Sequence, residues 1–291
     1  MTVRAARVNG VELHYSDTGY HAQSQTAALL LHGGAGDLES WPHQIRALSP
    51  HHRVVAYSRR HSHPNRNGEA HRARFADCVE DDIDDLLALQ SQLDLDPAHL
   101  IGTSYGALLA LGAALRAPDR VLGLVLAEPP LLRWASATEA GVRLYRAFIE
   151  DVWQAAADAF GRGQRQRAMQ LLTDGMWGRP VFGSWSCDRV AAVMRNATAM
   201  DALTRSHDPF PEFDRSAAAT LGLPTLLLQG AHTSPLHRCV MNELSRVMRE
   251  PRYIEIPLAG HGAANENPRA FNAAVASFLR LPPRGGQVGP S

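Results

Sequence analysis

Strand and helix patterns alternate along the first 130 residues, and this alternation restricts the fold more than any other feature of the chain. Apolar runs predict strands within residues 27–34, 52–60, 99–106 and 121–127. Apolar residues at helical spacing lie between these runs. A repeated strand–helix–strand order favours parallel strands with helices packed on both faces. The chain is therefore expected to have an α/β fold built on a mostly parallel, doubly wound sheet.

The alternation stops in the middle of the chain. Residues 131 to about 220 carry only helical patterns, whereas strand patterns return at 224–230 and 252–260. This change predicts a helical insertion within the α/β core. We expect a first core part in residues 1–130, a helical cap or lid in 131–220, a second core part in 221–281, and a disordered Pro/Gly-rich tail in 282–291.

Composition excludes several kinds of partner. The 291 residues include 29 basic and 29 acidic side chains, so the formal net charge is zero. This balance gives no support for a nucleic-acid or membrane partner. Three widely spaced cysteines, Cys78, Cys187 and Cys239, fit a reducing cytoplasm without a disulfide framework. The chain begins without an apolar signal region and has no apolar run of 18 residues, so we expect neither a signal peptide nor a membrane span.

The stretch GTSYG, Gly102 to Gly106, marks a candidate nucleophile. It matches the pattern G-x-S-x-G, and an apolar strand precedes it while a helix follows it directly. In this context the serine lies on a sharp turn that exposes its hydroxyl above the sheet. Glycines lack the Cβ atoms that would clash across so tight a turn. Ser104 is therefore a candidate nucleophile.

With this motif in place, residues 8–280 resemble the α/β-hydrolase family. The stretch LLLHGGAG (29–36) is similar to the family's oxyanion loop, which implies an oxyanion hole formed by the N–H groups of Gly34 and Tyr105. The stretch LAGHGAANENP (258–268) is similar to the family's catalytic-histidine loop. The resemblance implies that His261 is the general base.

The position of the catalytic acid departs from the family's usual pattern. In the family, the acid usually follows the strand that corresponds to 224–230, in the pattern Gly, two residues, Asp. This chain has QGAHTSP there, with Thr233 at the position of the Asp. Some family members instead carry the acid at the end of the strand that follows the nucleophile helix. Glu128, in the stretch AEPP, occupies that place and is the expected acid. The alternative is that Glu128 pairs with an Arg at the strand end or binds substrate.

Substrate-contacting residues are less well defined by the sequence. Most aromatic residues of the insertion are expected to pack its own core, and one or two to cover the site. The candidates are Gly33, Trp134, Trp177, Trp185 and His232. His237 is expected either to contact substrate or to lie on the surface.

The resemblance implies a serine hydrolase that cleaves an ester, lactone or thioester of a small, largely apolar molecule through an acyl-Ser104 intermediate. No cofactor or metal is expected: His61 and His63 lack a Cys or carboxylate at ligand spacing. A serine at position 104 argues against reactions that need a carboxylate nucleophile. Two alternatives stay open, a non-hydrolytic enzyme of the same fold (lyase, cyclase or cofactor-free oxygenase) and a hydrolase-like binding protein. The expected partner is a small-molecule substrate. We expect the protein to lie in the cytoplasm, and a homodimer is left open.

Overall fold

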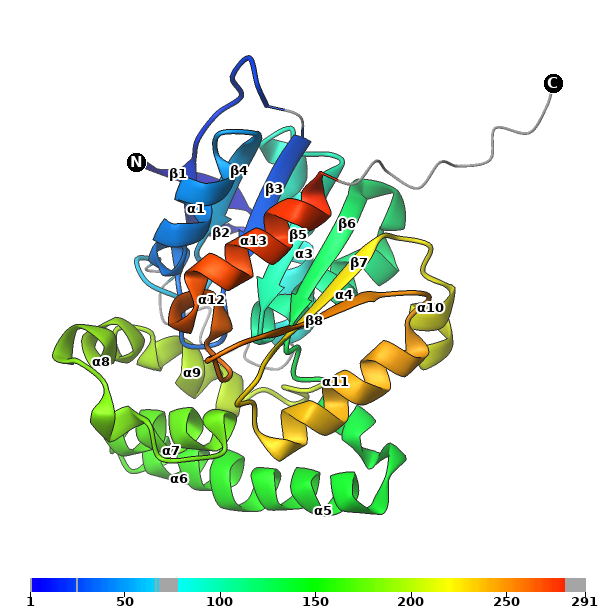
Figure 1. Cartoon of the computed structure of the whole chain (residues 1–291). Coiled ribbons are helices and arrows are strands. Elements are labelled where there is room, and N and C mark those ends of the chain that lie inside the picture. Colours follow the sequence, from blue (N-terminus) through cyan, green and yellow to red (C-terminus); the bar gives the residue numbers. More distant parts are fainter. Residues whose placement is uncertain (1, 25, 66, 68–77, 281–291) are drawn as a thin grey trace.

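An eight-stranded sheet forms the centre of the computed structural model, which describes residues 2–24, 26–65, 67 and 78–280. The strand order is β1-β2-β4-β3-β5-β6-β7-β8 (Figure 1). The strands are β1 (Val3–Val8), β2 (Val11–Asp17), β3 (Thr26–Leu31), β4 (His52–Tyr57), β5 (Ala98–Thr103), β6 (Val121–Ala127), β7 (Thr225–Gly230) and β8 (Arg252–Ile256). Strands β3 to β8 pair in parallel, and β1 and β2 add an antiparallel edge. The predicted α/β class is confirmed.

The antiparallel edge begins with a tight hairpin. Val8 of β1 pairs with Val11 of β2, so the turn consists of Asn9 and Gly10. Both residues have positive φ, 46° and 80°, as a type I′ turn requires. Asn tolerates this conformation and Gly adopts it without strain, and this preference explains why the sequence predicts the turn.

The parallel strands are buried on both faces, which explains their unbroken apolar runs. In β3, Leu29 and Leu31 join one core cluster, while Ala28 and Leu30 join the cluster on the opposite face. Helices α3 (Cys78–Gln92), α4 (Tyr105–Arg116) and α11 (Pro235–Val247) pack in the first cluster. Helices α1 (Pro42–Leu48) and α13 (Pro268–Leu279) cover the other face, with the short α12 (Ala263–Glu266) beside them (Figure 1).

The elements between β6 and β7 are helical throughout. They are η4 (Leu132–Ala137), α5 (Glu139–Ala147), η5 (Phe148–Gln154), α6 (Ala155–Gly161), α7 (Arg165–Trp177), η6 (Phe182–Ser184), α8 (Cys187–Met194), α9 (Ala197–Thr204) and α10 (Arg215–Thr220). Figure 1 shows α5 to α9 below the sheet, at the carboxyl ends of the strands. We call residues 131–220 the helical segment.

A π-helical turn interrupts the run of α-helix in the first part of this segment. The turn is η5, between α5 and α6. Gly175 of α7 lies so close to the side chain of Val152 in this turn that a Cβ at position 175 would overlap it. The apolar spacing predicts a helix here but cannot predict its wider turn, because that turn accompanies contact with a separate helix.

In the part of the chain that the structure describes, no helix combines the length and apolar character needed to cross a membrane. The predicted disordered tail, 282–291, lies outside the described residues.

Candidate active site

Ser104 forms the sharp turn between β5 and α4. Its φ of 50° is unusual for a residue with a Cβ, and its N–H donates a 2.7 Å hydrogen bond to the carbonyl of Ala127. A Cβ at Gly102 would overlap the Gly106 carbonyl, and a Cβ at Gly106 would overlap the Leu31 carbonyl. The two glycines are therefore needed for the strand, turn and helix to approach so closely.

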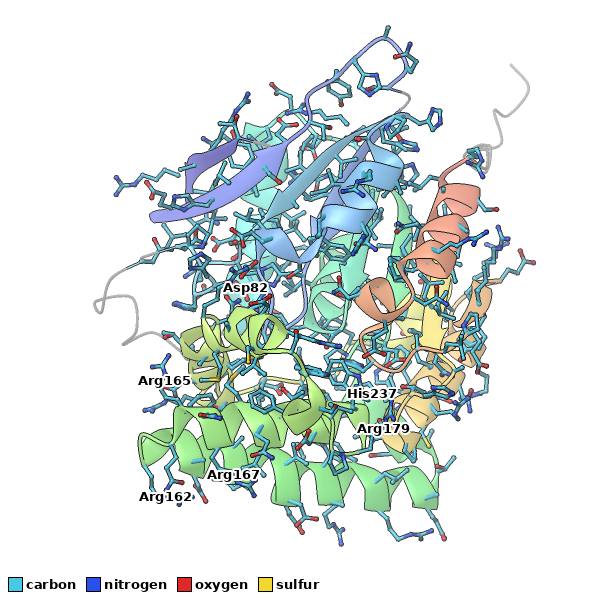
Figure 2. The ribbon with its side chains drawn as sticks, turned by 60° about the vertical axis from the view of Figure 1, so that its left-hand side comes forward. Asp82, Arg162, Arg165, Arg167, Arg179 and His237 are labelled. Atoms are coloured by element: carbon cyan, nitrogen blue, oxygen red, sulfur yellow. The ribbon has the colours of Figure 1, made fainter. Side chains whose placement is uncertain are left out.

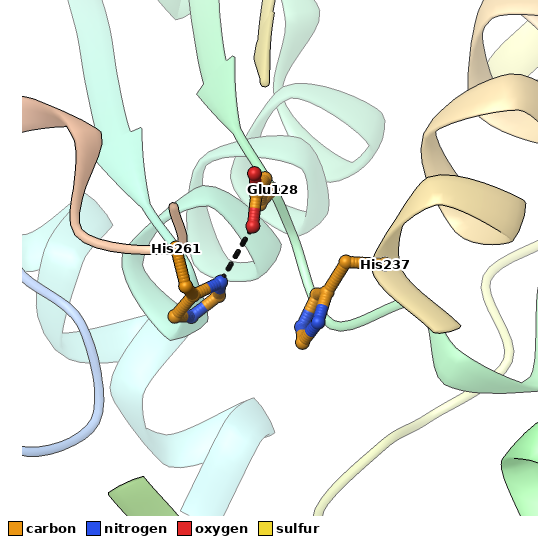
Figure 3. Close-up of side chains that lie close together, drawn as sticks. All are labelled: Glu128, His237 and His261. Carbon is orange, nitrogen blue, oxygen red and sulfur yellow. Dashed lines mark hydrogen bonds and ion pairs between the residues drawn. The ribbon is translucent and has the colours of Figure 1, made fainter. Parts of the chain in front are cut away.

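His261 lies on the loop between β8 and α12, directly beside this turn. Its Nε2 lies 2.9 Å from Oγ of Ser104, and its Nδ1 lies 2.7 Å from Oε2 of Glu128. Figure 3 shows the contact between His261 and Glu128. The Trp177 ring packs edge-on against the imidazole, with ring centroids 5.3 Å apart. The structure thus brings the predicted serine, histidine and carboxylate into one hydrogen-bonded chain.

Glu128 follows β6 and reaches across the end of β7. Its side chain is 3% exposed, and its φ is 47°. The Gly230 N–H donates a 2.8 Å hydrogen bond to Oε1, so both carboxylate oxygens are bonded. Burial raises the pKa of Glu128, but the hydrogen bond and charge interaction with His261 and the hydrogen bond from Gly230 outweigh burial and hold the pKa below its usual value. The carboxylate is therefore ionised at neutral pH.

The loop after β7, where the family usually carries its acid, has no carboxylate in residues 231–237. Thr233 is buried, and among the described residues its Oγ1 has no hydrogen-bond partner. Ser234 caps α11 by accepting from the His237 N–H. The sequence predicts that His237 either contacts substrate or lies on the surface. It is 1% exposed, so it does not lie on the surface. Its side chain lies on the inner face of α11 and points into the protein.

The loop after β3 holds the Gly34 N–H in a fixed orientation. The carbonyl of Gly33, in the same peptide unit, accepts hydrogen bonds from Nδ1 of His32 at 2.8 Å and from the Gly36 N–H at 3.0 Å. The Arg59 N–H donates to Nε2 of His32 at 3.1 Å, which leaves the ring proton on Nδ1. Burial, together with the charge of Arg59, lowers the pKa of His32 to about 3, so the ring is neutral.

Arg59 also contacts this loop through its side chain. The guanidinium donates to the Gly34 carbonyl at 2.8 Å and to Asp82 of α3 at 3.0 Å. It lies 4.4 Å from the centre of the Tyr105 ring. Asp82 and His237 both lie where the sheet meets the helical segment, whereas Arg162 and Arg167 lie farther from the sheet, on that segment (Figure 2). Arg59 is thus a buried cation beside both predicted oxyanion residues.

A cavity of about 460 Å³ opens beside Ser104 and His261, between the sheet and the helical segment. Its lining includes Gly33, Gly34 and Tyr105. The helical segment supplies a mainly apolar wall, which includes Trp153, Met169, Leu172, Met176, Met200, Leu203 and Phe210. Most of these residues are buried. The cavity therefore fits an apolar group next to the serine.

The predicted substrate residues fall into two groups. Gly33, Trp177 and Trp185 line this cavity. Trp134 does not: it is completely buried in η4, with the Arg215 guanidinium 5.4 Å from its ring centre. His232 is exposed and lies outside the described lining. The structure therefore does not place these two residues in the cavity lining, and chain position alone cannot show whether a side chain points into the core, the cavity or solvent.

Polar contacts of Asp37 and of Glu266 join the helical segment to the rest of the site. Arg195 pairs with Asp37 through hydrogen bonds of 2.8 and 3.1 Å. Glu266 accepts from Nε1 of Trp177 at 2.8 Å and from Arg189 at 3.2 Å. Sequence analysis missed both contacts, since their partners lie far apart along the chain and no local pattern links them.

Comparison with known proteins identifies the family. The alpha/beta hydrolase fold family matches residues 27–268, and the chain belongs to this family. Carboxylesterase YbfK of Bacillus subtilis (strain 168) is 28% identical over 86% of this chain and 79% of that protein. The uncharacterized hydrolase YraK of the same strain is 32% identical over 50% of this chain. The match spans only about half the length of that relative, 51%.

Solved structures show the same fold. The enol-lactonase from Burkholderia xenovorans LB400 superposes with a TM-score of 0.64 at 22% identity, covering 96% of this chain and 100% of that one. Epoxide Hydrolase A from Mycobacterium thermoresistibile superposes with a TM-score of 0.74 at 24% identity, covering 96% and 98%. Together with the family match, these similarities show the alpha/beta hydrolase fold.

Proposed function

We propose that the protein is a serine hydrolase that cleaves an ester, lactone or thioester of a small apolar molecule. The observation that carries this proposal is the chain of hydrogen bonds from Ser104 to His261 at 2.9 Å and from His261 to Glu128 at 2.7 Å. These distances lie within the range needed for a nucleophile, its general base and an orienting acid.

In the proposed mechanism, Ser104 Oγ attacks the substrate carbonyl while Nε2 of His261 takes its proton. The ionised Glu128 fixes the proton on Nδ1 of His261 and stabilises the imidazolium that forms. The N–H groups of Gly34 and Tyr105 stabilise the negative charge on the carbonyl oxygen. His261 then protonates the leaving group. Water, activated by the same histidine, hydrolyses the acyl-Ser104 intermediate.

The helical segment acts as a cap in this proposal and provides the substrate chamber. Apolar side chains from η5, α7 and α9 face the cavity, so the acyl group of the substrate is expected to be apolar. Asp37, Glu39, Arg189 and Arg195 also line the cavity, and they give it a polar portion. The relatives named for carboxylesterase and enol-lactonase activity are consistent with cleavage of a carbonyl ester or lactone.

The direct test is capture of the acyl intermediate. Wild type and Ser104→Ala would be mixed with p-nitrophenyl butyrate, and turnover and intact mass would be measured on millisecond to minute timescales. We expect a burst with a butyryl adduct on Ser104, and a loss of about 10³-fold or more in the variant. Turnover that survives in Ser104→Ala would contradict the proposal. Substrate binding without turnover or adduct in the wild type would favour a binding protein.

A further inference from the structure

His237 is a buried imidazole that the proposed mechanism does not use. It lies on α11 with its ring centroid 4.4 Å from that of His261 (Figure 3). Its Nδ1 is 2.8 Å from Oγ of Ser234. Its Nε2 is buried and has no hydrogen-bond partner among the described residues. A neutral imidazole has one ring nitrogen without a proton, and that nitrogen offers an electron pair to a ligand.

This imidazole belongs to a compact set of donor atoms. Glu128, His237 and His261 each present one donor atom, and the three atoms lie within 4.8 Å of one another. Because Nδ1 of His237 contacts Ser234 and Nε2 of His261 contacts Ser104, Nε2 of His237 and Nδ1 of His261 are the nitrogens left for a shared ligand. Glu128 supplies a carboxylate oxygen beside them.

Two imidazoles and one carboxylate form a donor set that suits zinc and similar divalent transition ions. Magnesium and calcium prefer oxygen ligands and do not match it. Zinc bonds of about 2.0–2.1 Å place tetrahedral ligand atoms about 3.3 Å apart. The contact between Glu128 and His261 must therefore open slightly, and His237 must move closer.

We propose that Glu128, His237 and His261 form a binding site for zinc-like divalent ions that inhibits the enzyme. The inhibitory effect rests on the proposed serine hydrolase function. The metal takes the electron pair of Nδ1 of His261, and the proton that Nδ1 carried moves to Nε2. The ring stays neutral, but Nε2 now donates to Ser104 and no longer accepts its proton. The nucleophile consequently loses its general base.

The surroundings of the site predict slow binding. His261 lines the cavity, whereas Glu128 and His237 lie behind it and are only 2% and 1% exposed. An ion that enters from the cavity must pass the His261 ring, which packs against Trp177. Inhibition should therefore develop over time and should be reversed by a chelator.

Cobalt(II) provides a direct test, because tetrahedral cobalt with nitrogen ligands absorbs visible light. Wild type, His237→Gln and His232→Gln would be titrated with Co²⁺ and followed by absorbance and calorimetry, with Zn²⁺ as the competitor. His232 is the matched control, an exposed histidine on the loop that precedes α11. We expect one equivalent to bind to wild type and His232→Gln, and at least tenfold weaker binding in His237→Gln. Wild type without a cobalt site, or His237→Gln with unchanged affinity, would overturn the proposal.

A second variant covers the case in which His237→Gln does not fold. Glu128→Gln removes the anionic ligand at nearly constant shape, and it should also bind cobalt at least tenfold more weakly. Unchanged affinity in this variant overturns the proposal as well.

Fluorophosphonate labelling separates the metal site from the proposed function. If both are correct, Zn²⁺ slows labelling of Ser104 in wild type much more than in His237→Gln. Absence of labelling without metal would contradict the serine hydrolase function alone, since cobalt binding does not depend on catalysis. Equal zinc sensitivity of the two proteins would overturn the metal site.

Discussion

At the scale of single residues, the glycines around Ser104 determine whether the nucleophile turn can form. A side chain at Gly106 would overlap the main-chain carbonyl of Leu31 in β3. Main-chain atoms in a buried sheet cannot move away as the end of a flexible side chain can. The motif is therefore a requirement of packing as well as of chemistry.

Gly106→Ala should lower the free energy of unfolding by at least about 3 kcal/mol, because β3 and α4 must separate to admit the methyl group. Gly161→Ala is the matched control: Gly161 ends α6, and a Cβ there would have no neighbour within 4 Å. It should be neutral or stabilising by up to about 1 kcal/mol. Urea unfolding of both variants measures this, and equal stabilities would contradict the packing argument.

At the scale of elements, Arg59 links β4, α3 and the loop that carries Gly34. It contacts Asp82, the Gly34 carbonyl and the Tyr105 ring, and it is 5% exposed. Its neighbour Arg60 pairs with Asp85 and Asp81 of the same helix. No contact between the Arg60 side chain and the Gly34 loop is found in the described residues, so the two arginines form a natural comparison.

Arg59→Lys should lower ester turnover roughly tenfold with little change in KM, since a lysine cannot hold Asp82 and the Gly34 carbonyl together. The loss is smaller than the 10²–10³ expected for removing an oxyanion donor itself, because the Gly34 N–H is still present. Arg60→Lys should keep the turnover of the wild type. Steady-state kinetics of both variants test this; an Arg59→Lys enzyme with normal kcat would show that the loop holds its geometry without the guanidinium.

The sequence predicts those parts of the fold and site that depend on local constraints. The Asn9–Gly10 turn and the turn at Ser104 depend on backbone conformations that few residues tolerate, so their sequences are diagnostic. The position of Glu128 follows from a strand end and a family resemblance. The burial of Trp134 and His237, and the pairing of Arg195 with Asp37, arise from contacts between distant segments. No local pattern encodes such contacts, and only the folded chain shows them.

At the scale of the whole molecule, buried histidines couple stability to pH. Burial is the main cause that lowers the pKa of His32 and His237 to about 3 and that of His99, in β5, to about 4. An unfolded histidine titrates near 6.5. Below that pH the unfolded chain binds more protons than the folded chain, so protonation favours unfolding.

Each of these histidines should remove about 1.4 kcal/mol of stability per pH unit below 6.5, until the pH reaches its folded pKa. We expect the midpoint of urea unfolding to change little between pH 8 and 7 and to fall steeply between pH 6.5 and 5. His99→Gln, remote from the serine, should flatten this fall, because it removes one of the four buried histidines of the described residues whose pKa burial lowers; the fourth is His52. An unfolding midpoint independent of pH between 7 and 5 would contradict the argument.

The central claim is that Glu128 activates Ser104 through His261, and the rate of fluorophosphonate labelling tests it most directly. Wild type, Glu128→Gln and Glu255→Gln would be labelled in parallel and read by intact mass. Glu255 lies on β8, is exposed, and contacts Arg238 on the surface. We predict rapid labelling at Ser104 in wild type and Glu255→Gln, and a rate at least about a hundredfold lower in Glu128→Gln, because a neutral amide no longer stabilises the imidazolium. Equal rates in all three proteins would contradict the account and would require another source for the catalytic acid.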